Sequence, residues 1–164
     1  MYDGQTIGVV VPAHNEAGHV GTVIETMPAY VDRIYAVDDA SPDESWAVIR
    51  RVAERLNERA AGDDANPAVA VADGGDDRRV VPIRHERNRG VGGAIKTGYL
   101  AAIRDGTDIV AVMGGDGQMD PDLLPDIVAP VADGRAAYAK GNRLCSSSDR
   151  SSMPTFRQAG NRML

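Results

Sequence analysis

Short apolar runs alternate along this chain with segments in which apolar residues recur every three or four positions. Residues 7–11 are nearly all β-branched and apolar, a pattern typical of a strand covered on both faces. Residues 17–30 carry Val20, Val23, Ile24 and Met27 at the spacing of one helix face. By the same criteria we predict strands at 33–37, 80–84, 108–113 and 136–140, and helices at 43–59 and 92–104. Asp120-Pro121 predicts the start of a further helix, with inward positions Leu123, Leu124, Ile127, Val128 and Val131.

Strands that alternate with helices form βαβ units, so we predict an α/β fold with a Rossmann-like, mostly parallel sheet flanked by helices. The 164 residues are enough for one domain. Residues 60–79 break the alternation, because they are acidic and contain few bulky apolar side chains. We expect them to form a flexible acidic surface insertion, or a short edge strand at 68–72.

Composition argues against several classes of function. Eighteen basic against 24 acidic residues give a net charge of −6, whereas non-specific binding of nucleic acid requires clustered Lys and Arg. The one cysteine, Cys145, excludes an internal disulfide and a Cys-based zinc site. No apolar stretch approaches the roughly 20 residues of a membrane span, and no signal peptide precedes the first strand. We therefore expect a cytoplasmic location.

Polar segments follow several of the predicted strands, where ligands of parallel sheets bind. They include Asn15-Glu16, Asp38-Asp39, residues 88–93 and Asp116. Two adjacent carboxylates at a strand end can bind a metal ion, accept hydrogen bonds from a nucleoside, or cap the next helix. A cap contributes about 1 kcal/mol and needs only one of the two carboxylates, so capping does not explain the pair.

Two glycine-rich segments offer further chemistry. Residues 88–98 lead into a helix, and their glycines would let the backbone approach a phosphate. Ile95 stands where a Walker A loop or a dinucleotide-binding fingerprint needs glycine, so a close-packed turn is an equally good interpretation. In residues 114–120, Asp116 lies between glycines where its carboxylate can reach Mg²⁺ or Mn²⁺, and Gln118 offers a second oxygen. Asp120 is interpreted instead as a helix cap.

The histidines and the tryptophan give weaker signals. His14, His19 and His85 are not spaced as a set of metal ligands, and we interpret His14 as a solvated loop residue. Trp46 is interpreted as a packing residue on its helix.

In this order, residues 9–16, 37–43, 88–99 and 113–121 resemble the inverting family 2 glycosyltransferases. Within that family they are most similar to the polyprenyl-phosphate sugar synthases of the dolichyl-phosphate mannose or glucose type. The resemblance implies a GT-A fold, which is a nucleotide-binding α/β sheet. It also implies one glycosyltransferase catalytic domain over residues 1–164, truncated at its C-terminus because the family usually continues further.

The resemblance assigns roles to particular positions. It implies that the loop lining the nucleoside contains Pro12, Ala13, Asn15 and Glu16. Asp39 resembles the acid that meets the base, with Asp38 beside it, and Arg89 and Lys96 would approach the nucleotide.

The same resemblance implies a metal ion and an acceptor site. Asp116 matches the last acid of the family's Asp-x-Asp metal triplet, and Gln118 the glutamine that often follows. Gly114 replaces the first acid, which leaves Mg²⁺ or Mn²⁺ to Asp116, water and the diphosphate. Arg143 and Arg157 resemble two arginines that bind the acceptor phosphate, although two solvated arginines are an equally good interpretation.

The implied function is the inverting transfer of a hexose from a UDP- or GDP-linked sugar to a polyprenyl or dolichyl phosphate at the cytoplasmic face of a membrane. No general base is identifiable, which favours an acceptor that is already anionic. A nucleotidyltransferase that makes nucleotide sugars is an alternative, although residues 12–16 differ from the Gly-, Arg- and Lys-containing loop expected there. The other alternative is a non-catalytic nucleotide-sugar-binding module, which is favoured by Gly114 in place of an acid.

Overall fold

The computed structural model describes residues 1–62 and 78–141. The elements of that part of the chain are β1 (Ile7–Ala13), α1 (Val20–Glu25), β2 (Arg33–Asp38), α2 (Ser45–Gly62), β3 (Val80–Arg84), α3 (Gly90–Arg104), β4 (Ile109–Val112), a 3₁₀ turn (Pro121–Leu123) and α4 (Leu124–Ala132). The predicted alternation of strands and helices is confirmed. Each of these strands lies within two residues of its predicted bounds.

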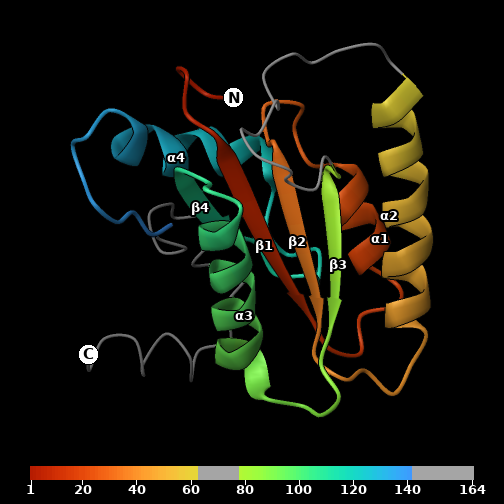
Figure 1. Ribbon diagram of the computed structural model, residues 1–164. Helices are drawn as coiled ribbons and strands as arrows, with labels where there is room; N and C mark the ends of the chain where they lie inside the picture. The colour runs from red at the N-terminus through yellow and green to blue at the C-terminus, as the bar shows by residue number, and fades with distance from the viewer. Residues whose placement is uncertain (63–77, 142–164) are drawn as a thin grey trace, which may run out of the picture.

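The described strands form one parallel sheet in the order β3-β2-β1-β4 (Figure 1). From the central β1 the chain builds outward through β2 and β3, then returns to add β4 on the other side of β1. Such a reversal opens a crevice at the carboxyl ends of the strands, where ligands of α/β sheets bind. Ala13 and Asp38 are paired in register at this edge, and so are Asp38 and Arg84.

Helices cover both faces of the sheet (Figure 1). One apolar cluster joins α1, α2 and α4 to Ile7, Val9 and Val11 of β1. The other joins α3 to Val10, whose side chain points to the opposite face. The packing of α3 is close, because a Cβ atom on Gly98 would lie 2.4 Å from Cγ1 of Val10. The strands thus lie between two apolar layers, as their unbroken apolar sequence predicts.

Two predicted elements differ from the structure. The helix predicted at 17–30 extends only from Val20 to Glu25, because proline disfavours helical conformation in the residue before it, here the one before Pro28. Residues 136–140 form no strand: the Ala136 N–H bonds to the Pro130 carbonyl as the chain turns after α4, and Tyr138 is 75% exposed.

The start of the last helix also differs. Leu123, predicted to face inward, is 58% exposed, because a 3₁₀ turn precedes α4 and changes the angular position of the side chain. Leu124 and Val128 are buried as predicted, and Ile127 and Val131 are half-buried.

Some expectations fall outside the described residues, among them the edge strand at 68–72 and most of the predicted insertion at 60–79. Within the described ranges, none of the helices combines the length and the apolar character needed to cross a membrane.

Candidate functional site

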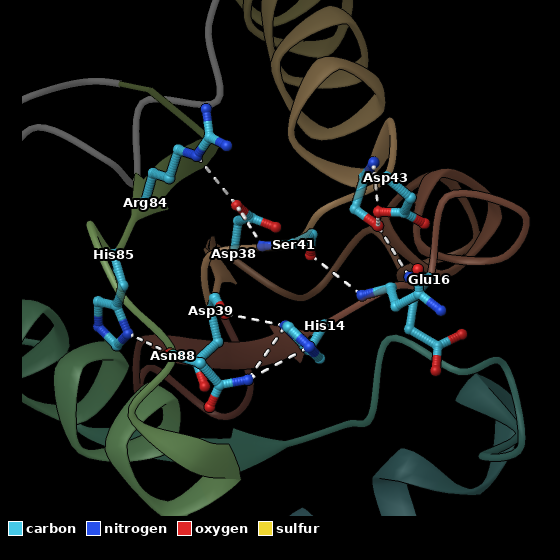
Figure 2. A network of polar contacts seen from close by, with 11 residues as sticks. His14, Glu16, Asp38, Asp39, Ser41, Asp43, Arg84, His85 and Asn88 are labelled. Carbon is cyan, nitrogen blue, oxygen red and sulfur yellow. Dashed lines mark hydrogen bonds and ion pairs between the residues drawn. The ribbon is translucent and has the colours of Figure 1, made fainter.

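A network of polar side chains lies where β1, β2 and β3 end (Figure 2). Asp39 is at its centre and is 2% exposed. Its backbone N–H donates to the carbonyl of Ala13, which ties it to the end of β1. Its Oδ1 accepts hydrogen bonds from Nδ1 of His85 at 2.6 Å and from the backbone N–H of Arg89 at 2.8 Å. Through its backbone and its carboxylate, Asp39 therefore joins the end of β1 to the segment between β3 and α3.

The surroundings of Asp39 keep it ionised. Burial alone would raise the pKa of this carboxyl group, but the hydrogen bonds from His85 and from Arg89 N–H, with the charge of His85, outweigh burial and lower the pKa below its ordinary value. The hydrogen bonds from His85 and Arg89 both reach Oδ1, and the backbone N–H of Gly90 also helps to lower the pKa of this carboxyl group. At neutral pH Oδ2, which receives neither the His85 nor the Arg89 bond, can accept a hydrogen bond from a ligand N–H or O–H group.

Asp38 is fully buried and forms a different set of contacts. Its Oδ2 lies 3.2 Å from Nε of Arg84, whose guanidinium group also lies 5.6 Å from the ring centroid of Trp46. Its Oδ1 has no hydrogen-bond partner among the described residues. Beside this pair is a hollow of about 580 Å³ lined by Ala40, Arg84, His85 and Glu86. Trp46 also packs against the core, as predicted.

The loops after β1 and β2 are joined side by side. Hydroxyl and carboxylate oxygens of the second loop accept N–H groups of the first: Ser41 from Asn15, Ser45 from Glu16, and Asp43 from Ala17, at 2.8–3.0 Å. Asp43 also accepts the N–H of Ser45 at the start of α2. Asp43 therefore caps this helix, and neither carboxylate of the Asp38-Asp39 pair is used for that purpose.

His14 is exposed, yet it is not simply a solvated loop residue. Its Nδ1 lies 2.9 Å from the carbonyl oxygen of Asp39, and the Asn88 amide nitrogen lies 3.2 Å from its Nε2. The imidazole therefore connects the end of β2 to the segment that leads into α3 (Figure 2).

Asp116 lies in the loop after β4, next to β1. The Gly115 N–H donates to the carbonyl of Pro12, so this loop is fixed to the end of β1. One oxygen of Asp116, Oδ1, accepts the N–H of Gln118 at 3.1 Å and closes a turn. No group of three His, Cys, Asp or Glu side chains that could hold a metal ion is found in ranges 1–62 and 78–141. Asp120 accepts the N–H of Asp122 and caps the 3₁₀ turn, as predicted.

Most of the predicted site residues lie at one edge of the sheet: Pro12, Ala13, Asn15, Glu16, Asp38, Asp39, Arg89, Asp116 and Gln118. Lys96 is not part of this arrangement, because it is exposed on the side of α3 opposite the buried stripe of Ala94, Gly98 and Ala102. Arg143 and Arg157 lie outside the described residues.

The sequence reasoning missed the contribution of His85, which is buried and contacts Asp39 directly. Its position immediately after a predicted strand was the available signal. Arg84, which pairs with Asp38, was also missed, and its position as the last residue of β3 was a similar signal.

Known proteins resemble this chain in sequence and in fold. The model of the family described as Glycosyl transferase family 2 matches residues 8–163. The UDP-N-acetylglucosamine–dolichyl-phosphate N-acetylglucosaminyltransferase of Methanococcus voltae is 28% identical over 94% of this chain and 59% of its own length. An uncharacterized protein of Methanocaldococcus jannaschii is 27% identical over the same share of this chain and 54% of its own length. The chain thus spans little more than half of these curated relatives.

Two solved structures share the fold. A mannosyltransferase from Pyrobaculum calidifontis, in complex with GDP-Man and Mn²⁺, gives a TM-score of 0.53 at 25% identity, over 77% of this chain and 32% of that one. A glucosyl-3-phosphoglycerate synthase from Mycobacterium tuberculosis was solved in complex with Mn²⁺, UDP and glucosyl-3-phosphoglycerate. It gives a TM-score of 0.50 at 21% identity, over 78% of this chain and 40% of that one. These likenesses confirm the predicted GT-A fold.

Proposed function

This chain belongs to glycosyl transferase family 2, and from that premise we propose that it transfers a hexose from a UDP- or GDP-linked donor, with inversion, to a polyprenyl or dolichyl phosphate. The observation that carries the donor half is the Asp39 carboxylate, which is ionised, fixed by two donors and left with one accepting oxygen at the carboxyl edge of the sheet. The Pyrobaculum mannosyltransferase, solved with GDP-Man and Mn²⁺, supports a nucleoside diphosphate donor.

In this proposal the residues of the site bind and orient the donor. Oδ2 of Asp39 accepts an N–H of the base, and Arg89 and the loop of Asn15 and Glu16 lie beside the nucleoside. The acceptor oxygen attacks the anomeric carbon from the face opposite the diphosphate, and the bond to the diphosphate oxygen breaks with its electron pair. An acceptor phosphate is already anionic, so the step needs no general base from this chain.

The acceptor is proposed from chemistry and from one relative. The named activity of the Methanococcus voltae relative, on dolichyl phosphate, supports a lipid phosphate acceptor. Such an acceptor would place the reaction at the cytoplasmic face of a membrane. Arg143 and Arg157 stay proposed as its phosphate-binding residues.

The residues present fit a divalent cation with one protein carboxylate. Mg²⁺ commonly binds through one or two carboxylates together with substrate phosphates and water. Asp116 supplies one carboxylate, oriented by the N–H of Gln118, and Gly114 supplies none. When bound, the ion would stabilise the charge that develops on the leaving diphosphate. Asp116 and the Gln118 amide are the side chains that would hold it.

Calorimetry tests the proposal. We expect UDP or GDP, or the corresponding sugar conjugate, to bind more tightly with Mn²⁺ than with a chelator, and Asp116→Ala to remove the metal-dependent part. Asp126→Asn, which changes an exposed carboxylate on α4, is the matched control and should bind as the wild type does. A folded chain that binds none of these nucleotides would sink the donor-site proposal.

A non-catalytic nucleotide-sugar-binding module is the second candidate, and the observation that favours it is Gly114 in place of an acid. The two candidates differ in turnover. Slow hydrolysis of a bound nucleotide sugar, or transfer to a polyprenyl phosphate, supports the enzyme. Tight binding with no release of sugar over many hours supports the module.

A further inference from the structure

His85 is a buried histidine with a hydrogen-bond contact at each ring nitrogen. Its side chain is 4% exposed and lies between the end of β2 and α3. Nδ1 lies 2.6 Å from Oδ1 of Asp39, and Nε2 lies 2.9 Å from the hydroxyl oxygen of Thr97 on α3. Its own backbone N–H donates to the carbonyl of Asp38. Both the ring and the main chain of His85 are therefore fixed.

We propose that His85 is a positioning residue of the donor site, which holds the Asp39 carboxylate so that Oδ2 faces the nucleotide, and that Thr97 orients the imidazole ring for this purpose. The inference rests on the proposed function only in naming a nucleotide as the group that Asp39 meets.

The geometry decides which atoms donate. Oδ1 of the ionised Asp39 can only accept, so Nδ1 of His85 must carry the proton that points at it. The Thr97 hydroxyl group can either donate to Nε2 or accept from it, so the 2.9 Å contact fixes the orientation of the imidazole ring whichever atom carries the proton. With Arg89 N–H as the second donor to Oδ1, rotation of the carboxylate about its Cβ–Cγ bond would break two hydrogen bonds. Oδ2 is therefore the oxygen left for a ligand.

Other charged groups lie near His85 but have different partners. Asp38 is paired with Arg84, and His14 bonds to the Asp39 carbonyl rather than to its carboxylate. Glu86, Asn88 and Arg89 are exposed on the segment after β3, and Lys96 is exposed on the outward side of α3. Among the described residues, His85 is therefore the side chain that contacts the Asp39 carboxylate.

The first test needs no nucleotide. The pKa of Asp39 is measured by NMR titration in the wild type, His85→Leu and His85→Asn. We expect the leucine to raise the pKa of Asp39, and the asparagine, whose amide nitrogen can occupy the place of Nδ1, to keep it low. An unchanged pKa of Asp39 in folded His85→Leu would overturn the inference, whatever the nucleotide experiments show.

The second test measures the affinity for UDP and GDP by calorimetry near pH 7. We expect His85→Leu to weaken binding about tenfold, which corresponds to about 1.4 kcal/mol. His85→Asn should recover most of this loss, and Thr97→Val should show a smaller loss. Thr26→Val is the matched control, because the bonds of the Thr26 hydroxyl group within the described residues go to carbonyls of α1.

A double-mutant cycle separates positioning from a general structural effect. If His85 acts through Asp39, His85→Leu should cost no further affinity in an Asp39→Asn background, whereas additive losses would contradict the inference. Absence of nucleotide binding by the wild type would instead overturn the proposed function and the recognition half of this inference. The NMR result would then decide the contact between His85 and Asp39 separately.

Discussion

Ala40 shows local strain beside the candidate site. Its φ angle is 55°, in the left-handed region that side chains with a Cβ atom rarely adopt. The neighbouring Asp39 and Ser41 are held by hydrogen bonds, so the conformation of Ala40 is imposed by the loop around it.

Substitution of Ala40 by glycine should therefore stabilise the protein. We expect Ala40→Gly to raise the free energy of unfolding by about 1 kcal/mol, because glycine adopts positive φ without the Cβ clash. Urea denaturation measures this difference. Ala29→Gly, at an exposed position without positive φ, is the control and should lower stability slightly. Equal losses at both positions would show that Ala40 is not strained.

The lowered pKa of Asp39 predicts the sign of a pH effect. A carboxyl group whose pKa is lower in the folded chain than its ordinary 3.8 stabilises the fold above that value, and this contribution is lost as the pH falls through the folded-state pKa. We expect wild type to be more stable than Asp39→Asn at pH 6, and the difference to shrink below about pH 4. Urea midpoints of both proteins at several pH values test this, and a difference that grows on acidification would contradict it.

Among the elements, α2 depends on a cap that also joins two loops. Asp43 accepts the N–H groups of both Ser45 and Ala17. We expect Asp43→Ala to destabilise the protein by about 1–2 kcal/mol, through loss of the cap and of the contact between loops. Glu44→Ala, at the exposed neighbouring position, should change stability by less than about 0.5 kcal/mol. Thermal or urea unfolding of both variants separates the two positions.

The packing of α3 on the sheet depends on the small side chain at position 98. A Cβ atom there would overlap the Val10 side chain, so Gly98→Ala should destabilise the protein by about 1–3 kcal/mol although alanine favours helices. At Gly18 the same change meets no atom within 4 Å, and we expect a nearly neutral result. Chemical denaturation of both variants tests whether the close contact with Val10 determines the loss of stability at position 98.

The elements also show what a sequence can predict. The strands were predictable because a strand covered on both faces leaves an unbroken apolar run, as at 7–11. The short length of α1 and the absence of a strand at 136–140 were not predictable, because the same apolar pattern fits several backbone conformations. The acids of the site followed from strand ends and from the resemblance. The contact between His85 and Asp39 could not be predicted from the sequence, because it depends on β3 pairing with β2 and on α3 packing across both strands.

At the scale of the whole molecule, the site exists only because the sheet brings distant segments together. Asp39 contacts the end of β1, the residue after β3 and the residue that precedes α3, while Asp116 reaches the same edge from β4. A nucleotide bound across this edge would contact loops from several strands at once. Its binding free energy should therefore stabilise the whole fold and not one loop.

Ligand-dependent melting tests this coupling. At a free nucleotide concentration of about 100 times Kd, binding adds about 2.7 kcal/mol to the free energy of unfolding. Each kcal/mol raises Tm by about 2–4 °C in a chain of this size, so we expect a shift of about 5–10 °C with UDP or GDP and Mn²⁺.

Two variants separate the metal ion from the base. Asp116→Asn should lose the part of the Tm shift that depends on Mn²⁺ and keep the part that is still seen with a chelator. Asp39→Asn should reduce both parts, because its carboxylate is proposed to meet the base and not the metal ion. A shift that Mn²⁺ alone reproduces, without nucleotide, would contradict a metal site completed by the diphosphate.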